Sequence, residues 1–285
     1  MRSLAKRILP ESIKAGIKNV LLQRASHHAR MARKTYWEWL FKSYHPKYQA
    51  DKAPLMSRVS NFESLFEASE DQFKTTITPH VSEFAWSVGE VYNGQFVSID
   101  PELYYSMIRQ HKPSRIIEIG SGYSTHFAID ALRMNQTGQI TCIDPEPRRS
   151  LPKGVTHIEA KVEEVGTDVF ADLGENDILF VDSSHTTEEA IYHCQQILPH
   201  LGKGVIVHHH DFTFPYDIHY GDDPVVFDEP GVLLEFYSAN RDSFEVLVCA
   251  SYVRFRNPDL VNRLIESYRW NPLRVPGSLW TRKKD

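Results

Sequence analysis

Acidic side chains and histidines follow apolar runs at four places in the second half of the chain. These groups are Glu118 to Gly122, Asp144, Asp182 to His185, and the pair His210 and Asp211. If the apolar runs are parallel strands of one sheet, their carboxyl ends meet at the same edge, where open α/β sheets bind ligands. Carboxylates and imidazoles gathered there could bind a nucleotide, move a proton or hold a metal ion.

The stretch "RIIEIGSGYST" has the pattern of a strand, a glycine turn and a helix. The apolar run 116–119 stops at Gly120, Ser121 and Gly122, and a helical pattern begins near Ser124. A glycine turn between a strand and a helix commonly brings the backbone close to a bound nucleotide. We therefore expect Gly120, Ser121, Gly122 and Ser124 to bind a cofactor.

The residues around this turn favour a nucleotide without phosphate. Dinucleotide-binding turns prefer G-x-G-x-x-G, and here Thr125 stands at the third glycine position. The carboxylate of Glu118 would repel a pyrophosphate but suits a cationic amino-acid head group, such as that of S-adenosylmethionine. Asp144 lies 24 residues after Gly120, close to the spacing of about 20 for an acid that binds ribose hydroxyls. Alternatively, Glu118 only caps the helix and Asp144 starts a turn with Pro145.

Strand and helix patterns alternate from about residue 96 onward. This alternation predicts a doubly wound, mostly parallel sheet. The predicted strands are 115–119, 139–144, 156–162, 177–182, 204–211, 244–255 and 277–283, and the predicted helices are 101–110, 124–134, 187–201, 230–240 and 257–268.

Four segments resemble, in order, motifs of the class I S-adenosylmethionine-dependent methyltransferases. They are "RIIEIGSGYST", "CIDPEP", "ILFVDSSHTTEEA" and "GKGVIVHHHDF", and the resemblance covers roughly residues 90–285. The segments "VDSSH" and "HHHD" are most similar to small-molecule and sugar O-methyltransferases and to methyltransferases associated with polysaccharide synthesis. The resemblance implies a seven-stranded Rossmann-like fold whose last strand, in "GSLWTRK", is antiparallel.

The same resemblance implies roles for the polar residues of the later strands. Asp182 would face the cofactor's methyl group, and His185 matches a base three residues after the first acid in sugar methyltransferases. Asp182 and Asp211 match the acids with which metal-dependent O-methyltransferases hold a divalent cation such as magnesium. The family often has two adjacent oxygen ligands after the fifth strand, whereas this chain has His210 before Asp211; a softer metal, or none, remains open.

Simpler interpretations remain for several of these residues. His185 could cap the next helix together with Thr186, and each of the histidines 208–210 could be a buried residue with one hydrogen bond. The loop "FTFPYDIHYGDDP" is long and polar, and Tyr216 and Asp217 in it could bind the substrate. The same loop could equally be an ordinary surface excursion.

Charge is distributed unevenly along the chain, whose net charge is −5. Residues 1–58 hold 13 Lys and Arg against 3 Asp and Glu, whereas the remainder holds 19 against 34. An acidic body argues against a nucleic-acid substrate. We expect a basic, helical extension over residues 1–75 and a methyltransferase domain over 76–285, with a loosely ordered connection at 50–80. The extension could pack on its domain, join a homo-oligomer, or contact the inner face of a membrane.

Three dispersed cysteines and the lack of a signal peptide or a membrane-spanning run favour a cytoplasmic protein. The function predicted from the residues and the resemblance together is O-methylation of a hydroxyl on a small molecule or glycan by S-adenosylmethionine. One alternative is an NAD(P)-dependent oxidoreductase. The other is a non-catalytic adapter that keeps the methyltransferase fold.

Overall fold

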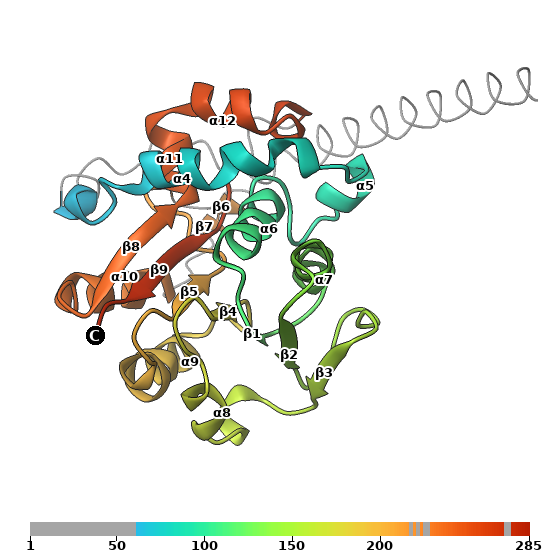
Figure 1. Ribbon diagram of the computed structural model, residues 1–285. Helices are drawn as coiled ribbons and strands as arrows, with labels where there is room; N and C mark the ends of the chain where they lie inside the picture. Colours follow the sequence, from blue (N-terminus) through green and yellow to red (C-terminus); the bar gives the residue numbers. More distant parts are fainter. Residues whose placement is uncertain (1–60, 217–218, 221–222, 225–228, 271–274) are drawn as a thin grey trace, which may run out of the picture. The chain divides into compact units, whose positions relative to one another are not determined.

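A sheet of seven strands forms the centre of the part of the chain that the structure describes. The computed structural model describes residues 61–216, 219–220, 223–224, 229–270 and 275–285. The strand order is β3-β2-β1-β4-β5-β9-β8 (Figure 1). The first five of these strands are parallel to their neighbours, and β9 pairs antiparallel with both β5 and β8. The strands are β1 (Arg115–Ile119), β2 (Gln139–Ile143), β3 (Val155–Ile158), β4 (Ile178–Val181), β5 (Ile206–His209), β8 (Phe244–Cys249) and β9 (Leu279–Lys283).

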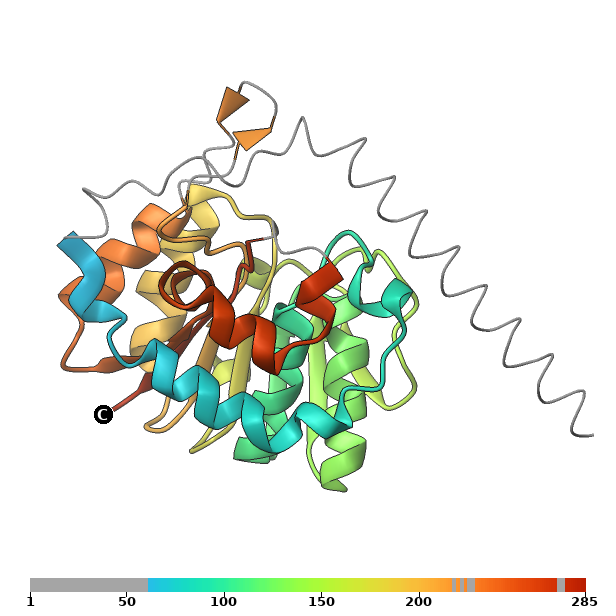
Figure 2. The same cartoon turned by 90° about the horizontal axis from the view of Figure 1, so that it is seen from above.

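Helices cover both faces of the sheet (Figure 1). Helices α4, α6 and α7 lie on one side, while α8, α9 and α10 lie on the other. The short pair β6 (His219–Tyr220) and β7 (Asp223–Pro224) lies apart from the central sheet (Figure 2). The α-helices are α4 (Ser69–Ile77), α5 (Val88–Val91), α6 (Asp100–His111), α7 (Tyr123–Asn135), α8 (Asp168–Ala171), α9 (Thr187–Tyr192), α10 (Glu229–Ala239), α11 (Ala250–Arg256) and α12 (Pro258–Leu264).

The central strands are apolar because helices cover them on both sides. Every residue of β4 is buried, as is every residue of β1 after Arg115. Strands buried on both faces read as continuous apolar runs in the sequence, which is why "RIIEI" and "DILFV" were recognisable. The predicted doubly wound, mostly parallel fold with an antiparallel last strand is confirmed.

Only the first half of the strand predicted over residues 244–255 is a strand in the structure. Residues 244–249 form β8, but residues 250–256 turn into α11 instead of continuing the strand. The partner strand β9 begins at Leu279, opposite Cys249, so beyond the bond from the Ala250 N–H to the Ser278 carbonyl, at 2.9 Å, the backbone has no strand to pair with. The helix satisfies those backbone groups instead, which overrides the strand-like composition.

The segment expected to be a loose connection contains an ordered helix. Helix α4 buries Phe73 and Ile77 and packs against β8 and α6. Part of the predicted extension therefore packs with the domain. The remainder of that extension, residues 1–60, lies outside the described residues, as does the expected contact with a membrane or a second subunit. Among the described residues, no helix is both long and apolar enough to cross a membrane.

Candidate functional site

The carboxyl ends of four parallel strands are tied to one another by backbone hydrogen bonds. The residue that follows each strand donates its N–H to the last carbonyl of a neighbouring strand. These bonds run from Gly120 to Ile143, from Asp144 to Ile158, from Asp182 to Ile119 and from His210 to Val181, at 2.9–3.1 Å. The polar groups singled out from the sequence therefore share one rim of the sheet, in a register fixed by the backbone.

The first glycine of the turn is required by its surroundings. Gly120 has φ of +87°, in the left-handed region. A Cβ atom at Gly120 would lie 1.9 Å from the carbonyl oxygen of Asp182. The ends of β1 and β4 can approach this closely only because residue 120 has no side chain. At Gly122, by contrast, a Cβ would meet nothing within 4 Å, so the space beside the second glycine is open.

Glu118 lies beneath the turn and has its partners inside the protein. Its side chain is fully buried and accepts hydrogen bonds from Tyr104 at 3.0 Å and Thr125 at 2.6 Å. The Thr125 hydroxyl in turn accepts the N–H of Gly122 at 3.1 Å. The carboxyl group therefore supports the glycine turn from below. This position differs from the direct contact with a cationic head group that the sequence suggested.

Burial raises the pKa of Glu118 to about 7, although hydrogen bonds from Thr125 and Tyr104 oppose the rise. The group is then partly neutral near pH 7, which weakens the electrostatic argument made for it from the sequence. The support that it gives to the turn does not require a full negative charge, because a neutral carboxyl group still accepts hydrogen bonds.

Asp144 is held where a ribose diol could reach it. It directly follows β2 and is 9% exposed. One of its carboxylate oxygens accepts from the Ser121 hydroxyl at 2.6 Å and the other from the N–H of Glu146 at 2.9 Å. Two carboxylate oxygens offer about four acceptor positions, so capacity remains for two further donors. Ser124, in the first turn of α7, is almost fully buried.

A pair that the sequence did not single out joins the same two loops. The Arg149 guanidinium lies over the Tyr123 ring, 4.0 Å from its centroid. Tyr123 is the first residue of α7, and Arg149 belongs to the loop after Asp144. The loops that carry Ser121 and Asp144 are thus joined by a cation–π contact in addition to their hydrogen bond.

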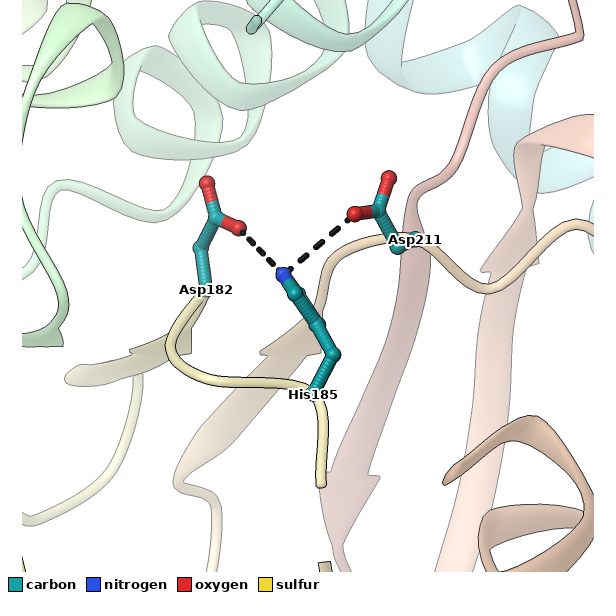
Figure 3. Close-up of side chains that lie close together, drawn as sticks. All are labelled: Asp182, His185 and Asp211. Atoms are coloured by element: carbon teal, nitrogen blue, oxygen red, sulfur yellow. Dashed lines mark ion pairs between the residues drawn. The ribbon is translucent and has the colours of Figure 1, made fainter. Parts of the chain in front are cut away.

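His185 joins the ends of β4 and β5. Its Nε2 atom lies 3.3 Å from Oδ1 of Asp182 and 3.3 Å from Oδ2 of Asp211 (Figure 3). Both His185 and Asp211 have left-handed backbones, with φ of 57° and 54°. These conformations turn the side chains of two separate loops toward each other. The alternative interpretation made His185 and Thr186 a cap of the next helix. Thr186 does cap α9, since its hydroxyl accepts from the N–H of Glu189. His185 instead faces the acids.

The partner of the other ring nitrogen was not found from the sequence. Nδ1 of His185 lies 2.8 Å from Oε2 of Glu229, the first residue of α10. Glu229 is 5% exposed. It follows His185 by 44 residues and adjoins no recognised motif, so only the packing of α10 beside α9 brings it to the site.

The acids determine the charge of the imidazole. Burial alone would lower the pKa of His185, but hydrogen bonds to Asp182 and Glu229, with the charge of Asp211, raise it to about 10. Burial would raise the pKa of Asp182, but the charge of His210 and the hydrogen bond with His185 lower it. In this arrangement His185 carries a proton at neutral pH. A protonated imidazole cannot accept a second proton, so the predicted role of His185 as a base requires that it first loses this one.

Three of the described residues could hold a metal ion together. One donor atom each from Asp182, His185 and Asp211 lies within 4.8 Å of the others. The sequence predicted His210 with the two acids, whereas the structure groups His185 with them. His210 lies behind the acids, with Nδ1 3.2 Å from Oδ1 of Asp182 and 3.5 Å from Oδ1 of Asp211.

The other two histidines of the triplet have structural positions. His208 is fully buried beside Phe180 and lies 3.0 Å from the Ser278 hydroxyl. His209 points to the opposite face, where it lies 2.8 Å from the Tyr237 hydroxyl. The interpretation of these two as packed histidines with one hydrogen bond each fits this geometry.

The predicted substrate residues are only partly described. Tyr216 packs edge-on against Phe255, and the Arg254 guanidinium lies 5.0 Å from the centroid of its ring. Asp217 lies outside the described residues. The role of both residues in acceptor binding stays a prediction.

Part of the chain that carries the site is similar to known proteins. Residues 117–212 match a family described as a methyltransferase domain. An uncharacterized protein of Archaeoglobus fulgidus is 34% identical over 92 residues, which are 30% of this chain and 42% of that protein. The chain thus spans less than half the length of this relative.

Two solved structures of O-methyltransferases align with much of this chain at low sequence identity. A proposed O-methyltransferase from Klebsiella pneumoniae aligns over 76% of this chain and 99% of its own, with 12% identity and a TM-score of 0.47. An O-methyltransferase from Streptomyces achromogenes, involved in tomaymycin synthesis and solved with S-adenosylmethionine, aligns over 80% of this chain and 96% of its own, with 15% identity and a TM-score of 0.42. The family match over residues 117–212 and the observed strand order agree with the resemblance to class I methyltransferases that the sequence motifs carry.

Proposed function

We propose that this protein transfers the methyl group of S-adenosylmethionine to a hydroxyl group of a small molecule or glycan. The observation that carries the proposal is the rim itself. It combines a glycine turn at 120–122, an acid at Asp144 and a cluster of acids and histidines beyond β4 and β5. These groups lie inside the segment that matches the methyltransferase family.

The residues present fit this cofactor. The open space beside Gly122 would admit a nucleoside near the backbone. Asp144 keeps acceptor capacity for a ribose diol after its bonds to Ser121 and Glu146. Glu118 and Thr125 keep the turn in place from below. When bound, the cofactor supplies an activated methyl group, and the protein's task is to align the acceptor with it.

The other end of the rim fits the acceptor. A hydroxyl group is a poor nucleophile until its proton leaves. Asp182, His185 and Asp211 are the described groups at this rim that could take that proton or hold a cation which acidifies the hydroxyl. The resemblance assigns the same end of the sheet to the reacting methyl group.

Binding calorimetry on the full-length protein tests the proposal. S-adenosylmethionine and its demethylated product should both bind, and NAD should not. Methyl transfer is then followed with labelled cofactor against a panel of hydroxyl compounds, including sugars and phenols. Tight NAD binding without S-adenosylmethionine binding would support an oxidoreductase instead. Cofactor binding without transfer to any acceptor would favour a non-catalytic adapter.

A further inference from the structure

Asp211 has a backbone conformation that its residue type does not favour. Its φ is 54°, in the left-handed region, which non-glycine residues adopt mainly where their surroundings enforce it. Asp211 lies where the chain leaves the sheet after β5, and its Oδ2 atom is 3.3 Å from Nε2 of His185. The segments that enforce this conformation therefore determine where the acid lies at the acceptor end of the rim.

Gly277, in the segment before β9, packs directly against Asp211. Its carbonyl oxygen accepts the N–H of Phe212 at 2.8 Å. A Cβ atom at residue 277 would lie 2.9 Å from the backbone nitrogen of Asp211 and 3.0 Å from its Cα. Such a close approach leaves no room for a side chain at residue 277. The position of Gly277 thus fixes the backbone of residues 211 and 212.

Asp100, the first residue of α6, holds Gly277 in this position. The N–H of Gly277 lies 3.2 Å from Oδ1 and 3.1 Å from Oδ2 of the Asp100 carboxylate. The same Oδ2 atom lies 3.6 Å from Nε2 of His210, the residue before Asp211. The other ring nitrogen of His210, Nδ1, lies 3.5 Å from Oδ1 of Asp211. Asp100 therefore contacts residues on both sides of Asp211.

A role in starting α6 does not account for these contacts. An acid in the first turn of a helix is favoured by the helix dipole, and a capping side chain accepts from N–H groups of its own helix. Asp100 accepts instead from Gly277, which is 177 residues away in the sequence. Its side chain is 1% exposed, and a buried carboxylate is costly unless its partners compensate. The partners of Asp100 belong to the rim and not to its own helix.

We propose that Asp100 is a positioning residue for the reaction, and that it fixes the carboxylate of Asp211 by holding Gly277 on one side and the His210 ring on the other. Asp100 acts through Asp211 and not on the acceptor. The inference rests on the proposed function, in which Asp211 is one of the groups that assist the loss of the acceptor proton. Methyl transfer depends on alignment, and a displacement of about 1 Å can lower the rate by about 10²-fold.

Amide hydrogen exchange of the full-length protein, followed by NMR without cofactor or acceptor, tests the contact itself. The N–H groups of Gly277 and Phe212 should exchange slowly in the wild type, because both are hydrogen-bonded within the protein. Asp100→Asn preserves the size of the side chain and one acceptor oxygen but removes the charge. It should speed exchange at both amides by at least about tenfold, whereas the amide of Ile117, in β1, should keep its wild-type rate.

Asp259→Asn is the matched control for this experiment. Asp259 is also in the first turn of a helix, α12, but its side chain is exposed, so both exchange rates should stay unchanged. Fast exchange of either amide in the wild type, or unchanged rates in Asp100→Asn, would overturn the role of Asp100. Because the first of these outcomes needs no variant, the inference stays testable even if Asp100→Asn does not fold.

A double-mutant cycle separates positioning from a general structural role. Asp100→Asn should lower kcat by between about 10-fold and 10²-fold and leave the dissociation constant of S-adenosylmethionine unchanged. In an Asp211→Asn background, the same substitution should lower kcat by less than about twofold more, because its effect passes through Asp211. An equal loss in both backgrounds would show that Asp100 acts elsewhere.

The two experiments distinguish a failure of this inference from a failure of the proposed function. If the protein transferred no methyl group, the proposed function would fail, while the exchange rates would still decide whether Asp100 holds Gly277. Methyl transfer that is unaffected by Asp100→Asn would leave the proposed function intact and overturn the positioning role.

Discussion

The two ends of the rim are built in different ways. At the cofactor end, Gly120 takes the left-handed conformation, and Glu118 and Asp144 have neutral donors as partners. At the reaction end, left-handed conformations fall on His185 and Asp211, and the acids face one another around imidazoles. Non-glycine residues in this conformation cost on the order of 1 kcal/mol each. At the cofactor end, the backbone conformation of the glycine turn forms the site. At the reaction end, charged side chains form the site, and strained backbone conformations hold them together.

The largest expected effect comes from a substitution that disrupts the glycine turn. Gly120→Ala should separate the ends of β1 and β4. Residue 120 has a left-handed backbone conformation, and its added Cβ would overlap the Asp182 carbonyl. We expect a loss of about 3 kcal/mol or more in the free energy of unfolding, measured by denaturant titration, and no cofactor binding. Gly166→Ala is the control, because its Cβ would meet nothing within 4 Å. A stable Gly120→Ala that binds cofactor would show that the contact between β1 and β4 is dispensable.

The next prediction removes one imidazole from the charge cluster and leaves the glycine turn unchanged. His185→Ala should lower turnover by roughly 10²–10⁴-fold and leave the dissociation constant of S-adenosylmethionine unchanged, because the glycine turn and Asp144 do not contact it. Initial rates and calorimetry measure the two quantities. The exposed His200→Ala serves as control. If both affinity and turnover fell together, the two ends of the rim could not be treated as separate.

A smaller effect tests the cofactor end alone. Asp144→Ala should raise the dissociation constant of S-adenosylmethionine by at least about tenfold, because charge-assisted hydrogen bonds to a ribose diol are worth roughly 1.5–3 kcal/mol each. Asp182→Ala should weaken cofactor binding less, because the resemblance places Asp182 near the methyl group. Calorimetry on both variants compares them. Equal affinity in the wild type and Asp144→Ala would remove Asp144 from the site.

The last prediction concerns Glu118 and the pH dependence of stability. Burial raises its pKa from 4.5 to about 7, so the unfolded chain loses this proton at lower pH than the folded protein. The stabilising contribution is intact below pH 4.5 and is lost as the pH rises to about 7. Relative to Glu118→Gln, the wild type should therefore lose about 2–3 kcal/mol of stability between pH 4.5 and 8. Parallel denaturant titrations would show a constant difference if Glu118 were ionised throughout.

The fold was predictable from the sequence because buried parallel strands are continuous apolar runs with polar residues at their ends. Residues Glu118, Asp144, Asp182 and Asp211 could be located for that reason. The role of Glu118 could not, because its partner Tyr104 comes from α6 and only packing shows that the carboxyl group lies under the turn.

The contact of Glu229 with His185 could not be predicted from the sequence for a similar physical reason. This contact depends on how α10 packs beside α9, and no local pattern encodes that packing. The turn of the chain into α11 at Ala250 was missed because the length of the partner strand, and not the composition of residues 250–256, ends β8. Local patterns thus located the strand ends, while contacts between distant segments determined what the side chains there do.

The backbone bonds between successive strand ends have a consequence for how this protein could diversify. Gly120, Asp144, Asp182 and His210 are anchored through their N–H groups, so their positions do not depend on their own side chains. Substitutions at the last three of these positions can then change the chemistry of the rim while the spacing between its groups is inherited intact. New acceptors or ions could be explored one residue at a time, without the scaffold having to be rebuilt at each step.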